Sequence, residues 1–359
     1  MNTPKLRFKE FSEEWKTFKM KNFLTIGSGR DYKHLGNGEV PVYGTGGLMT
    51  KVDDYLYDGD TVCIGRKGTI DKPLFHKGKI WTVDTLFYTH SFKDTKPYYV
   101  YLLFQRVNWK QHNEAGGVPS LAKSTIENIE FNLPSLLEQE KITSFFTAVD
   151  KKLTLLKEKK EKLETYKKGV MQQIFSQKLR FKDDQGKSFP EWEEKTLGEI
   201  VSVTTGRLDA NAMVENGKYR FYTCAKDFYF IDKYAFDMEA LLISGNGANV
   251  GYIHHYQGKF NAYQRTYVLG EFINISVKYL KYFLERNLSV RINKEKKAGN
   301  TPYIVLGTLT EMIIILPTLK EQEKIAQFLK ALDDKIELIS QQITKTELWK
   351  KGLLQQMFV

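Results

Sequence analysis

The chain has 359 residues, too many for one ordinary domain and well suited to two. Hydrophobic residues make up 42% of it and the mean hydropathy is only mildly negative, which excludes a disordered chain. Lysine and arginine outnumber aspartate and glutamate by 54 to 43, and the net charge of +11 favours a polyanionic partner without identifying one.

The two cysteines, Cys63 and Cys224, lie far apart in the sequence. They therefore indicate neither a disulfide framework nor a zinc site. The first residues, MNTPKLR, lack the apolar run of a secretion signal, and no run of about eighteen apolar residues occurs. We expect a cytoplasmic protein that does not enter a membrane.

In chain order, short apolar and aromatic runs alternate with glycine-containing turns, a pattern that predicts compact sheets. The runs expected to be strands are residues 61–64, 80–83, 241–243 and 267–269. The amphipathic segments 98–106 and 277–286 are expected to be short helices packed on those sheets. The globular parts are therefore expected to be mixed α/β.

Residues 133–175 and 316–358 are expected to be long helices, because their apolar side chains recur every seven positions. Both begin with Leu-Pro and then Glu-Gln-Glu, which places negative charge in the first helical turn, where the helix dipole favours it. The first apolar stripe consists of Ile142, Phe146, Val149, Leu153, Leu156, Leu163, Val170 and Ile174. The second, interrupted at Thr346, consists of Ile325, Leu329, Leu332, Ile336, Ile339, Ile343, Leu353 and Met357.

The second half of the chain repeats the first. LPSLLEQEKI and LPTLKEQEKI open the two helices, and KKGVMQQIF and KKGLLQQMF end them. The repeat reaches beyond the helices, since LRFK at 6–9 recurs at 179–182, and a tryptophan precedes Gly-Arg at the same distance in both halves. Residues 31–72 and 208–254 differ most. We expect variable domains at 1–132 and 179–315, followed by conserved spacer helices at 133–178 and 316–359.

The two long helices are expected to pair with each other. At about 1.5 Å per residue each would be roughly 60 Å long, which is more than is needed to cover one domain of this size. Two similar helices most simply bury their stripes against each other, and a two-fold relation between the repeats requires them to be antiparallel. The first helix then leads to the second domain and the second helix returns, so the chain nearly closes into a ring.

Signatures of DNA-modifying catalysis are weak. An adenine methyltransferase motif requires Asn or Asp before two prolines and an aromatic residue, which NLPS at 132–135 does not supply. The triplet at 186–188 resembles the end of a phosphate-binding loop, but Phe181 occupies the place of the loop glycine. Glu-x-Lys at 14–16 and 193–195 occurs in metal-dependent nucleases, yet is common in so charged a chain. A self-contained methyltransferase or nuclease, and a coiled-coil adaptor without DNA contact, remain the alternatives.

Polar and basic residues beside glycines in expected loops suit contacts with phosphates and base edges. Arg30 and Arg207 occupy matching positions, which favours a shared role in holding the DNA backbone. Loop residues in the divergent regions are expected to read bases instead. The candidate DNA contacts, none expected to be catalytic or to bind a metal, are Arg30, Lys33, Arg66, Lys67, Arg207, Asn246, Asn249, His254 and Arg265.

Both copies of the opening LPxLxEQEKI, both copies of the ending KKGxxQQxF and the duplicated frame resemble the specificity subunit of type I restriction-modification systems. The resemblance covers essentially the whole chain. It implies two α/β target recognition domains joined by two long antiparallel coiled-coil helices. Each domain would read one part of a bipartite sequence in double-stranded DNA.

The resemblance also implies partners. These are two methyltransferase subunits, which use S-adenosylmethionine to methylate adenine, and restriction subunits that act as motor and nuclease with ATP and Mg²⁺. This chain would bind no cofactor and would not catalyse a reaction. The family places methyltransferase docking on the helices and adjoining surfaces. The positions that match its motif, which could instead cap their helices, are Glu138, Gln139, Glu321 and Gln322.

Overall fold

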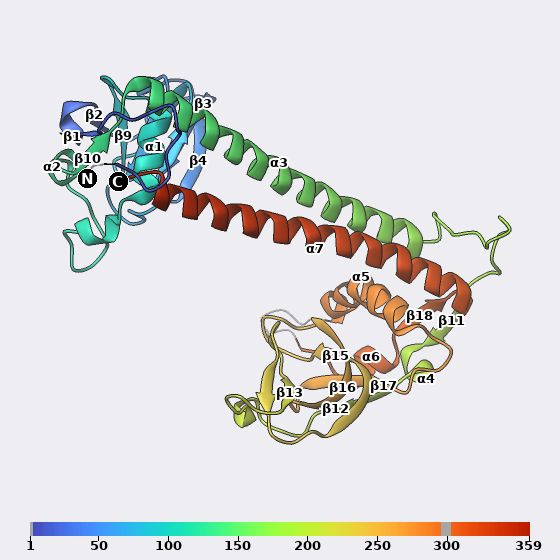
Figure 1. Cartoon of the computed structure of the whole chain (residues 1–359). Coiled ribbons are helices and arrows are strands. Elements are labelled where there is room, and N and C mark those ends of the chain that lie inside the picture. Colours follow the sequence, from blue (N-terminus) through green and yellow to red (C-terminus); the bar gives the residue numbers. More distant parts are fainter. Residues whose placement is uncertain (1–2, 296–302) are drawn as a thin grey trace. The chain divides into compact units, whose positions relative to one another are not determined.

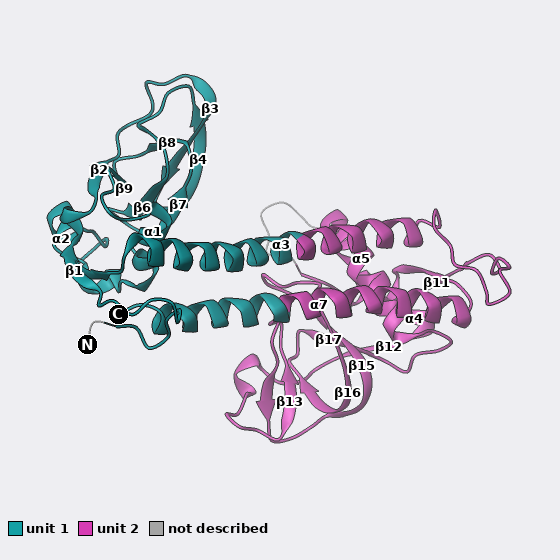
Figure 2. Ribbon diagram, turned by 45° about the horizontal axis from the view of Figure 1, so that its top comes forward, with its two compact units in different colours: residues 1–158, 341–359 teal, residues 159–340 magenta. Residues whose placement is uncertain are grey.

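The structure is a computed structural model that describes residues 3–295 and 303–359 and consists of two compact units (Figure 1, Figure 2). Unit 1 comprises Met1–Glu158 and Gln341–Val359, and unit 2 comprises Lys159–Ser340. Each unit contains one globular part and a stretch of both long helices, α3 (Leu136–Phe175) and α7 (Leu319–Gln356).

The globular part of unit 1 is built of short strands with two helices and two 3-10 turns. Its strands are β1 (Lys16–Lys19), β2 (Thr25–Ser28), β3 (Asn37–Gly44), β4 (Gly47–Val52), β5 (Tyr57–Asp58), β6 (Thr61–Gly65), β7 (Leu74–His76), β8 (Lys79–Thr82), β9 (Leu86–His90) and β10 (Glu130–Leu133). Its helical segments are η1 (Met20–Asn22), α1 (Pro97–Arg106), η2 (Trp109–His112) and α2 (Lys123–Glu127).

Two four-stranded sheets, ordered β2-β9-β6-β7 and β4-β3-β8-β5, form the body of unit 1. The chain bends between β5 and β6, and again between β7 and β8, where Gly59 and Gly78 exchange backbone hydrogen bonds of 3.4 and 3.2 Å. Both glycines have positive φ, 149° and 81°, a conformation that side-chain-bearing residues rarely adopt. The bend therefore turns one sheet into two. A separate ribbon of β1 and β10 leads into α3.

Unit 2 has the same plan with a continuous sheet, ordered β12-β17-β15-β16-β13-β14. The ribbon of β11 and β18 leads into α7, as β1 and β10 lead into α3. The strands are β11 (Glu193–Thr196), β12 (Ser202–Thr205), β13 (Tyr219–Tyr222), β14 (Tyr229–Ile231), β15 (Phe236–Ser244), β16 (Ile253–Ala262), β17 (Thr266–Gly270) and β18 (Ile313–Leu316). The helical segments are α4 (Leu197–Ile200), η3 (Ala210–Ala212), α5 (Val277–Glu295) and α6 (Leu306–Thr310).

One helix in each unit covers one face of the sheet and closes the core. In unit 1, Tyr99 and Leu103 of α1 share a buried cluster with Val62 and Ile64 of β6. In unit 2 the corresponding cluster joins α5 to β15 and β17. The four strands and two short helices expected from the sequence are confirmed, with two differences in extent: β15 begins at Phe236, five residues before the expected start, and α5 continues to Glu295, beyond the expected end at residue 286.

The long helices are antiparallel within each unit. In unit 1, Lys350 forms a 2.7 Å ion pair with Asp150, and Lys157 forms one of 2.7 Å with Glu347, so numbers rise along α3 as they fall along α7. In unit 2 the same direction follows from the 2.6 Å pair of Lys167 with Asp333 and from the shared cluster of Val170 and Ile174 with Ile325 and Leu329. The prediction of an antiparallel pair is confirmed for each unit.

The expected apolar stripes are buried at most positions, and a few of their members are half buried. Ile142, Phe146, Ile174 and Ile325 are at most 2% exposed. Leu156, Leu163, Ile336 and Leu353, expected to belong to the stripes, are only half buried. The boundary between the compact units falls within both helices, after Glu158 in α3 and after Ser340 in α7. The four-part division at residues 132, 178 and 315 stays a prediction.

In both units a backbone hydrogen bond joins the LRFK segment to the end of a long helix. In unit 2 the chain runs directly from α3 into the LRFK segment, and the amide of Leu179 donates to the carbonyl of Gln173 at 3.1 Å. In unit 1 the amide of Leu6 donates to the carbonyl of Gln356 at 2.9 Å. In unit 2 the helix and the LRFK segment are therefore consecutive in the chain. In unit 1 the two matching segments are far apart in sequence and are held together by packing and hydrogen bonds.

Candidate nucleic-acid interface

A buried carboxylate anchors the leading segment of unit 1 to the start of α3. Glu138 is 1% exposed and accepts two hydrogen bonds of 2.7 Å from the Nε and Nη2 atoms of Arg7. Trp15 donates its indole N–H to the same carboxylate at 3.2 Å. The bidentate geometry is the strong form of the arginine–carboxylate pair, and the hydrogen bonds that Arg7 donates to Glu138 raise the pKa of Arg7.

The neighbouring amide, Gln139, joins the start of α3 to the segment before α1. Its oxygen accepts from the backbone N–H of Lys96 and the hydroxyl of Thr95, both at 3.0 Å. Its nitrogen donates to the carbonyls of Asp94 and Pro134, both at 3.1 Å. Gln139 is fully buried, so this fourfold bonding fixes how the globular part of unit 1 sits on α3.

Unit 2 repeats both anchors. Glu321 is fully buried and accepts from Arg180 at 3.3 and 2.9 Å and from the indole of Trp192 at 2.9 Å. The oxygen of Gln322 accepts from the backbone N–H of Ser276 at 2.7 Å, and its nitrogen donates to the carbonyl of Pro317 at 2.8 Å. The duplicated Glu-Gln pair is thus an internal anchor in each unit.

These contacts bear on the expected partner-binding positions. Glu138, Gln139, Glu321 and Gln322 are each at most 1% exposed and bonded within their own unit. Their side chains are therefore inaccessible to another protein in this structure. Partner binding by them stays a prediction, and the geometry supports the alternative that they organise the helix starts. The sequence signal for the partners of Glu138 and Glu321 was the repeated LRFK segment, which supplies the arginine, together with the repeated tryptophan.

In unit 1 the ends of three strands form an edge that carries the expected DNA-contacting loops. β2 and β6 both end where β9 begins, because Ser28 pairs with Phe87 and Gly65 pairs with Leu86. Gly29 follows β2 so closely packed that a Cβ there would lie 2.0 Å from the carbonyl oxygen of Val83. This close approach holds the backbone at the strand end, and the following residue, Arg30, is exposed.

Arg66 and Lys67 follow β6 at the same edge. Their backbone N–H groups donate to the carbonyl of Thr85 at 2.8 and 3.2 Å, which fixes the loop while both side chains stay exposed. They line a hollow of about 570 Å³ that also contains Lys123 and the acidic Asp84. The lining holds three basic groups and two acidic ones, since Glu114 also belongs to it, and the exposed Arg66 and Lys67 suit phosphate and base-edge contacts. Lys33 is exposed in the loop between β2 and β3.

The equivalent edge of unit 2 carries a different set of side chains. Gly206 follows β12, and a Cβ there would lie 1.9 Å from the carbonyl oxygen of Ala262; its neighbour Arg207 is exposed like Arg30. Gly245 donates its N–H to the carbonyl of Arg265 at 2.9 Å, which leaves the Arg265 guanidinium exposed. Asn246, next along the chain, is half buried and forms a backbone bridge with Tyr303.

Two further candidates of unit 2 already use polar groups in contacts within the protein. Asn249 donates its amide to the carbonyl of Cys224 at 3.1 Å. His254 lies 3.0 Å from the carbonyl of Ala225, and burial lowers its pKa, which favours the neutral ring. His255 points to the other side of the strand and contacts Glu239, as expected for adjacent strand residues. Asn249 and His254 therefore have fewer free groups for DNA than Arg207 and Arg265.

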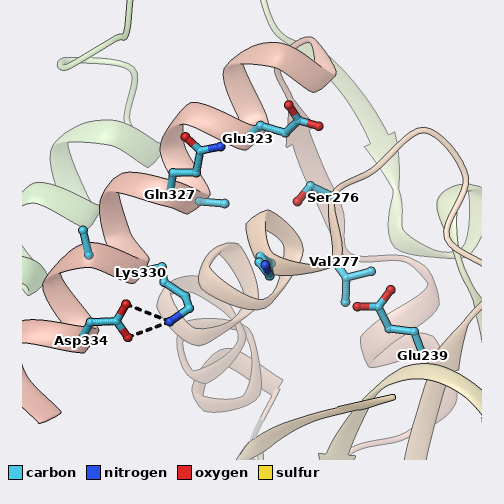
Figure 3. Close-up of a pocket in the computed structure, with 10 residues that line it drawn as sticks. Glu239, Ser276, Val277, Glu323, Gln327, Lys330 and Asp334 are labelled. Atoms are coloured by element: carbon cyan, nitrogen blue, oxygen red, sulfur yellow. Dashed lines mark hydrogen bonds and ion pairs between the residues drawn. The ribbon is translucent and has the colours of Figure 1, made fainter. Parts of the chain in front are cut away.

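Unit 2 has a hollow of about 670 Å³ between the start of α5 and α7 (Figure 3). Lys330 and Asp334 in it are paired with each other at 2.7 and 2.9 Å, and Glu239 is bonded to His255. We assign no ligand to this hollow. Among the described residues, His, Cys, Asp and Glu side chains form no group of three that could hold a metal ion, and no helix is long and apolar enough to cross a membrane.

Two segments of the chain, residues 12–165 and 190–348, match the family model of the type I restriction modification DNA specificity domain. The EcoDI specificity subunit of Escherichia coli is 41% identical over 152 residues, which cover 42% of this chain and 33% of that protein. This match thus spans about a third of the EcoDI subunit's length. The MjaVIII specificity subunit of Methanocaldococcus jannaschii is 26% identical over 338 residues, covering 83% of this chain and 76% of that protein.

Solved structures share the fold. The S subunit of a type I restriction-modification system from M. genitalium aligns with a TM-score of 0.70 at 17% identity and covers 99% of both chains. A chain from a structure concerned with assembly and conformational transition of the type I R-M system aligns with a TM-score of 0.58 at 15% identity and covers 96% of both.

Proposed function

The chain belongs to the type I restriction-modification DNA specificity family, and we propose on this premise that it recognises a bipartite DNA sequence for partner subunits that methylate and cut DNA. The edge loops of unit 1 read one part of the target, and those of unit 2 read the other. The observation that carries the proposal is the repetition of one anchored frame, with Glu138 and Glu321 at its centre, beneath two edges that differ in their side chains.

Comparison of the two edges supports two kinds of DNA contact, one shared by both units and one that differs between them. Arg30 and Arg207 follow matching close-packed glycines, so they contact the DNA backbone in both units. Arg66 and Lys67 stand where unit 2 has Asn246 and its neighbours. Arginine and lysine suit the guanine edge and asparagine suits adenine in the major groove, so this exchange of side chains changes the preferred base.

In this proposal the chain directs catalysis without performing it. Two methyltransferase subunits with S-adenosylmethionine methylate adenine within the target, and restriction subunits with ATP and Mg²⁺ cut the DNA. The chain itself binds no cofactor and works in the cytoplasm, where the host DNA lies. The exposed surfaces of the helices and adjoining domains receive the methyltransferase subunits.

We expect the purified chain alone to transfer no methyl group to DNA, and a mixture with its methyltransferase partner to methylate adenine at one bipartite sequence. Methylome sequencing of the host with and without this gene identifies that sequence. Loss of the gene should remove one motif completely, because recognition resides in this subunit. Methylation by the isolated chain, or an unchanged methylome, contradicts the proposal.

The long helices are expected to set the spacing between the two parts of the target. Inserting seven residues into α3 after residue 158 and seven into α7 after residue 340 adds about 10 Å to each helix. Both insertions fall between the Asp150–Lys350 pair and the Lys167–Asp333 pair, so each ion pair keeps its partner. The methylated motif should gain about three base pairs of spacer, at about 3.4 Å per base pair.

The matched control places the insertion in α3 alone. The stripes of the two helices then shift relative to each other by one heptad on one side, and site-specific methylation should be lost. A spacer that keeps its length in the doubly extended chain shows that the helices do not set it.

A further inference from the structure

A β-hairpin borders the candidate DNA edge at the same position in both units. In unit 1 it consists of β3 and β4, and Tyr43 at the end of β3 accepts from the backbone N–H of Val83 at 3.0 Å. In unit 2 it consists of β13 and β14, and Tyr222 accepts from Tyr263 at 2.9 Å. Both first strands run parallel to the strand before the edge, β8 or β16, so the hairpins are structural equivalents.

The hairpin of unit 1 is tight and presents apolar side chains. Gly44 pairs directly with Gly47, which leaves two residues in the turn. Leu48 and Met49 follow and are 60% and 54% exposed. The turn adjoins the Arg66–Lys67 loop, since a Cβ on Gly68 would lie 3.4 Å from the hydroxyl of Thr45. Apolar and basic side chains therefore stand beside each other at this edge.

The hairpin of unit 2 is longer and aromatic. Residues 223–228 connect its strands, and Phe228 and Phe230 are 37% and 44% exposed. Phe228 is held in place by Arg220, whose guanidinium carbon lies 4.2 Å from the Phe228 ring centroid and 4.5 Å from that of Tyr256. The Arg220 guanidinium therefore packs against the exposed Phe228 and fixes its position.

This hairpin is continuous with the proposed DNA loops of unit 2. The carbonyl of Cys224 accepts from Asn249 at 3.1 Å, and the thiol of Cys224 lies 3.4 Å from the carbonyl of Arg265. The connection also includes Lys226 and Asp227, which are both exposed and opposite in charge. With the exposed Arg265, positive groups still outnumber negative ones beside the aromatic residues, which matches DNA better than an apolar partner.

We propose that these hairpins contact thymine methyl groups in the major groove, through Leu48 and Met49 in unit 1 and through Phe228 in unit 2. The inference rests on the proposed function. The C5-methyl of thymine is the apolar feature that a major-groove reader can recognise, and apolar side chains are what it packs against. Every half-site that contains a methylatable adenine also contains a thymine opposite it, so each hairpin has a ligand.

The test uses the complex of the full chain with its methyltransferase partner and target duplexes in which the thymines of one half-site are replaced by uracil, which lacks only the methyl group. Covering one methyl group favours binding by about fourfold, so the wild-type complex should lose about that factor for each thymine contacted. Phe228→Ala should bind the thymine duplex about as weakly as wild type binds the uracil duplex. Replacing thymine by uracil in the half-site of unit 2 should then cause no further loss of DNA affinity in this variant.

Two controls keep the result interpretable. The Phe228→Ala complex should still lose affinity when uracil replaces thymine in the other half-site, because unit 1 is unchanged, and Leu48→Ala should show the reverse pattern. Ile273→Ala removes a 58% exposed apolar side chain that follows the far end of β17, and it should leave both responses as in wild type.

Three results overturn the inference. Equal wild-type affinity for thymine and uracil duplexes does so, as does a Phe228→Ala variant that weakens both duplexes by the same factor. Separation of Phe228→Ala from the methyltransferase in size-exclusion chromatography identifies the hairpin as a protein-docking surface instead. Absence of any site-specific binding by the wild-type complex contradicts the proposed function itself, and is distinguishable from the other three.

Discussion

Replacing Glu321 by alanine is expected to lower the free energy of unfolding of unit 2 by about 3 kcal/mol, because removing one member of a buried ion pair leaves the other uncompensated. Glu321 is fully buried and satisfies both Arg180 and the indole of Trp192. The Arg180 side chain is 21% exposed, so water recovers part of the loss, and the lower end of the usual range applies. Urea unfolding followed by circular dichroism measures the change.

Glu323→Ala is the matched control, since it removes an exposed carboxylate two residues away on the same helix. Its effect should stay within about 0.5 kcal/mol. Glu138→Ala should destabilise unit 1 by an amount similar to that of Glu321→Ala, because Arg7 and Trp15 make the same contacts there. A loss below about 1 kcal/mol for both anchor variants would show that the Arg–Glu–Trp contacts are not what holds the leading segments.

Exchanging residues 197–310 for the corresponding segment of another family member is expected to replace one part of the methylated sequence completely and leave the other part intact. The segment begins with α4 and ends with α6, so Arg180, Trp192 and Glu321 all lie outside it. The contacts that Gln322 makes inside it, to Ser276 and Asn274, use backbone atoms of the segment. Any replacement with the same backbone path can therefore reproduce them.

Methylome sequencing of cells that carry the exchanged chain provides the readout. The part of the target read by unit 1 serves as the internal control, because its edge is untouched. A change in both parts of the motif would show that the two units do not recognise DNA independently.

The long helices and the repeated frame could be predicted because their signals are local or repeated in the sequence. A seven-residue stripe is a property of neighbouring turns of one helix, and a repeat is visible by comparing the halves. The half burial of Leu156 and Leu163 was not predictable in this way, since it depends on how closely α7 packs against that stretch. The bend at Gly59 and Gly78 could not be predicted either, because it depends on two glycines that meet only in the folded sheet.

The candidate site could be predicted only in part. Glycines beside basic residues marked the loops at 29–30, 65–67 and 206–207, and the structure places them at strand ends. Glu138 looked like a surface residue because its partner Arg7 is 131 positions away in sequence. The hairpins carrying Leu48 and Phe228 were hidden for a related reason: exposed and buried apolar residues look the same in a sequence.

The ion pairs between the helices have a consequence for the origin of this architecture. α3 carries Asp150, whose partner Lys350 is on α7, and it carries Lys167, whose partner Asp333 is also on α7. Because the helices are copies of each other, Lys350 corresponds to Lys167 and Asp333 corresponds to Asp150. Each helix alone therefore holds both complementary charges, in the order that an antiparallel copy of itself requires. A chain of half this length could pair with a second copy through the same contacts, so gene duplication would have needed no new interface, only a peptide link between two subunits already matched.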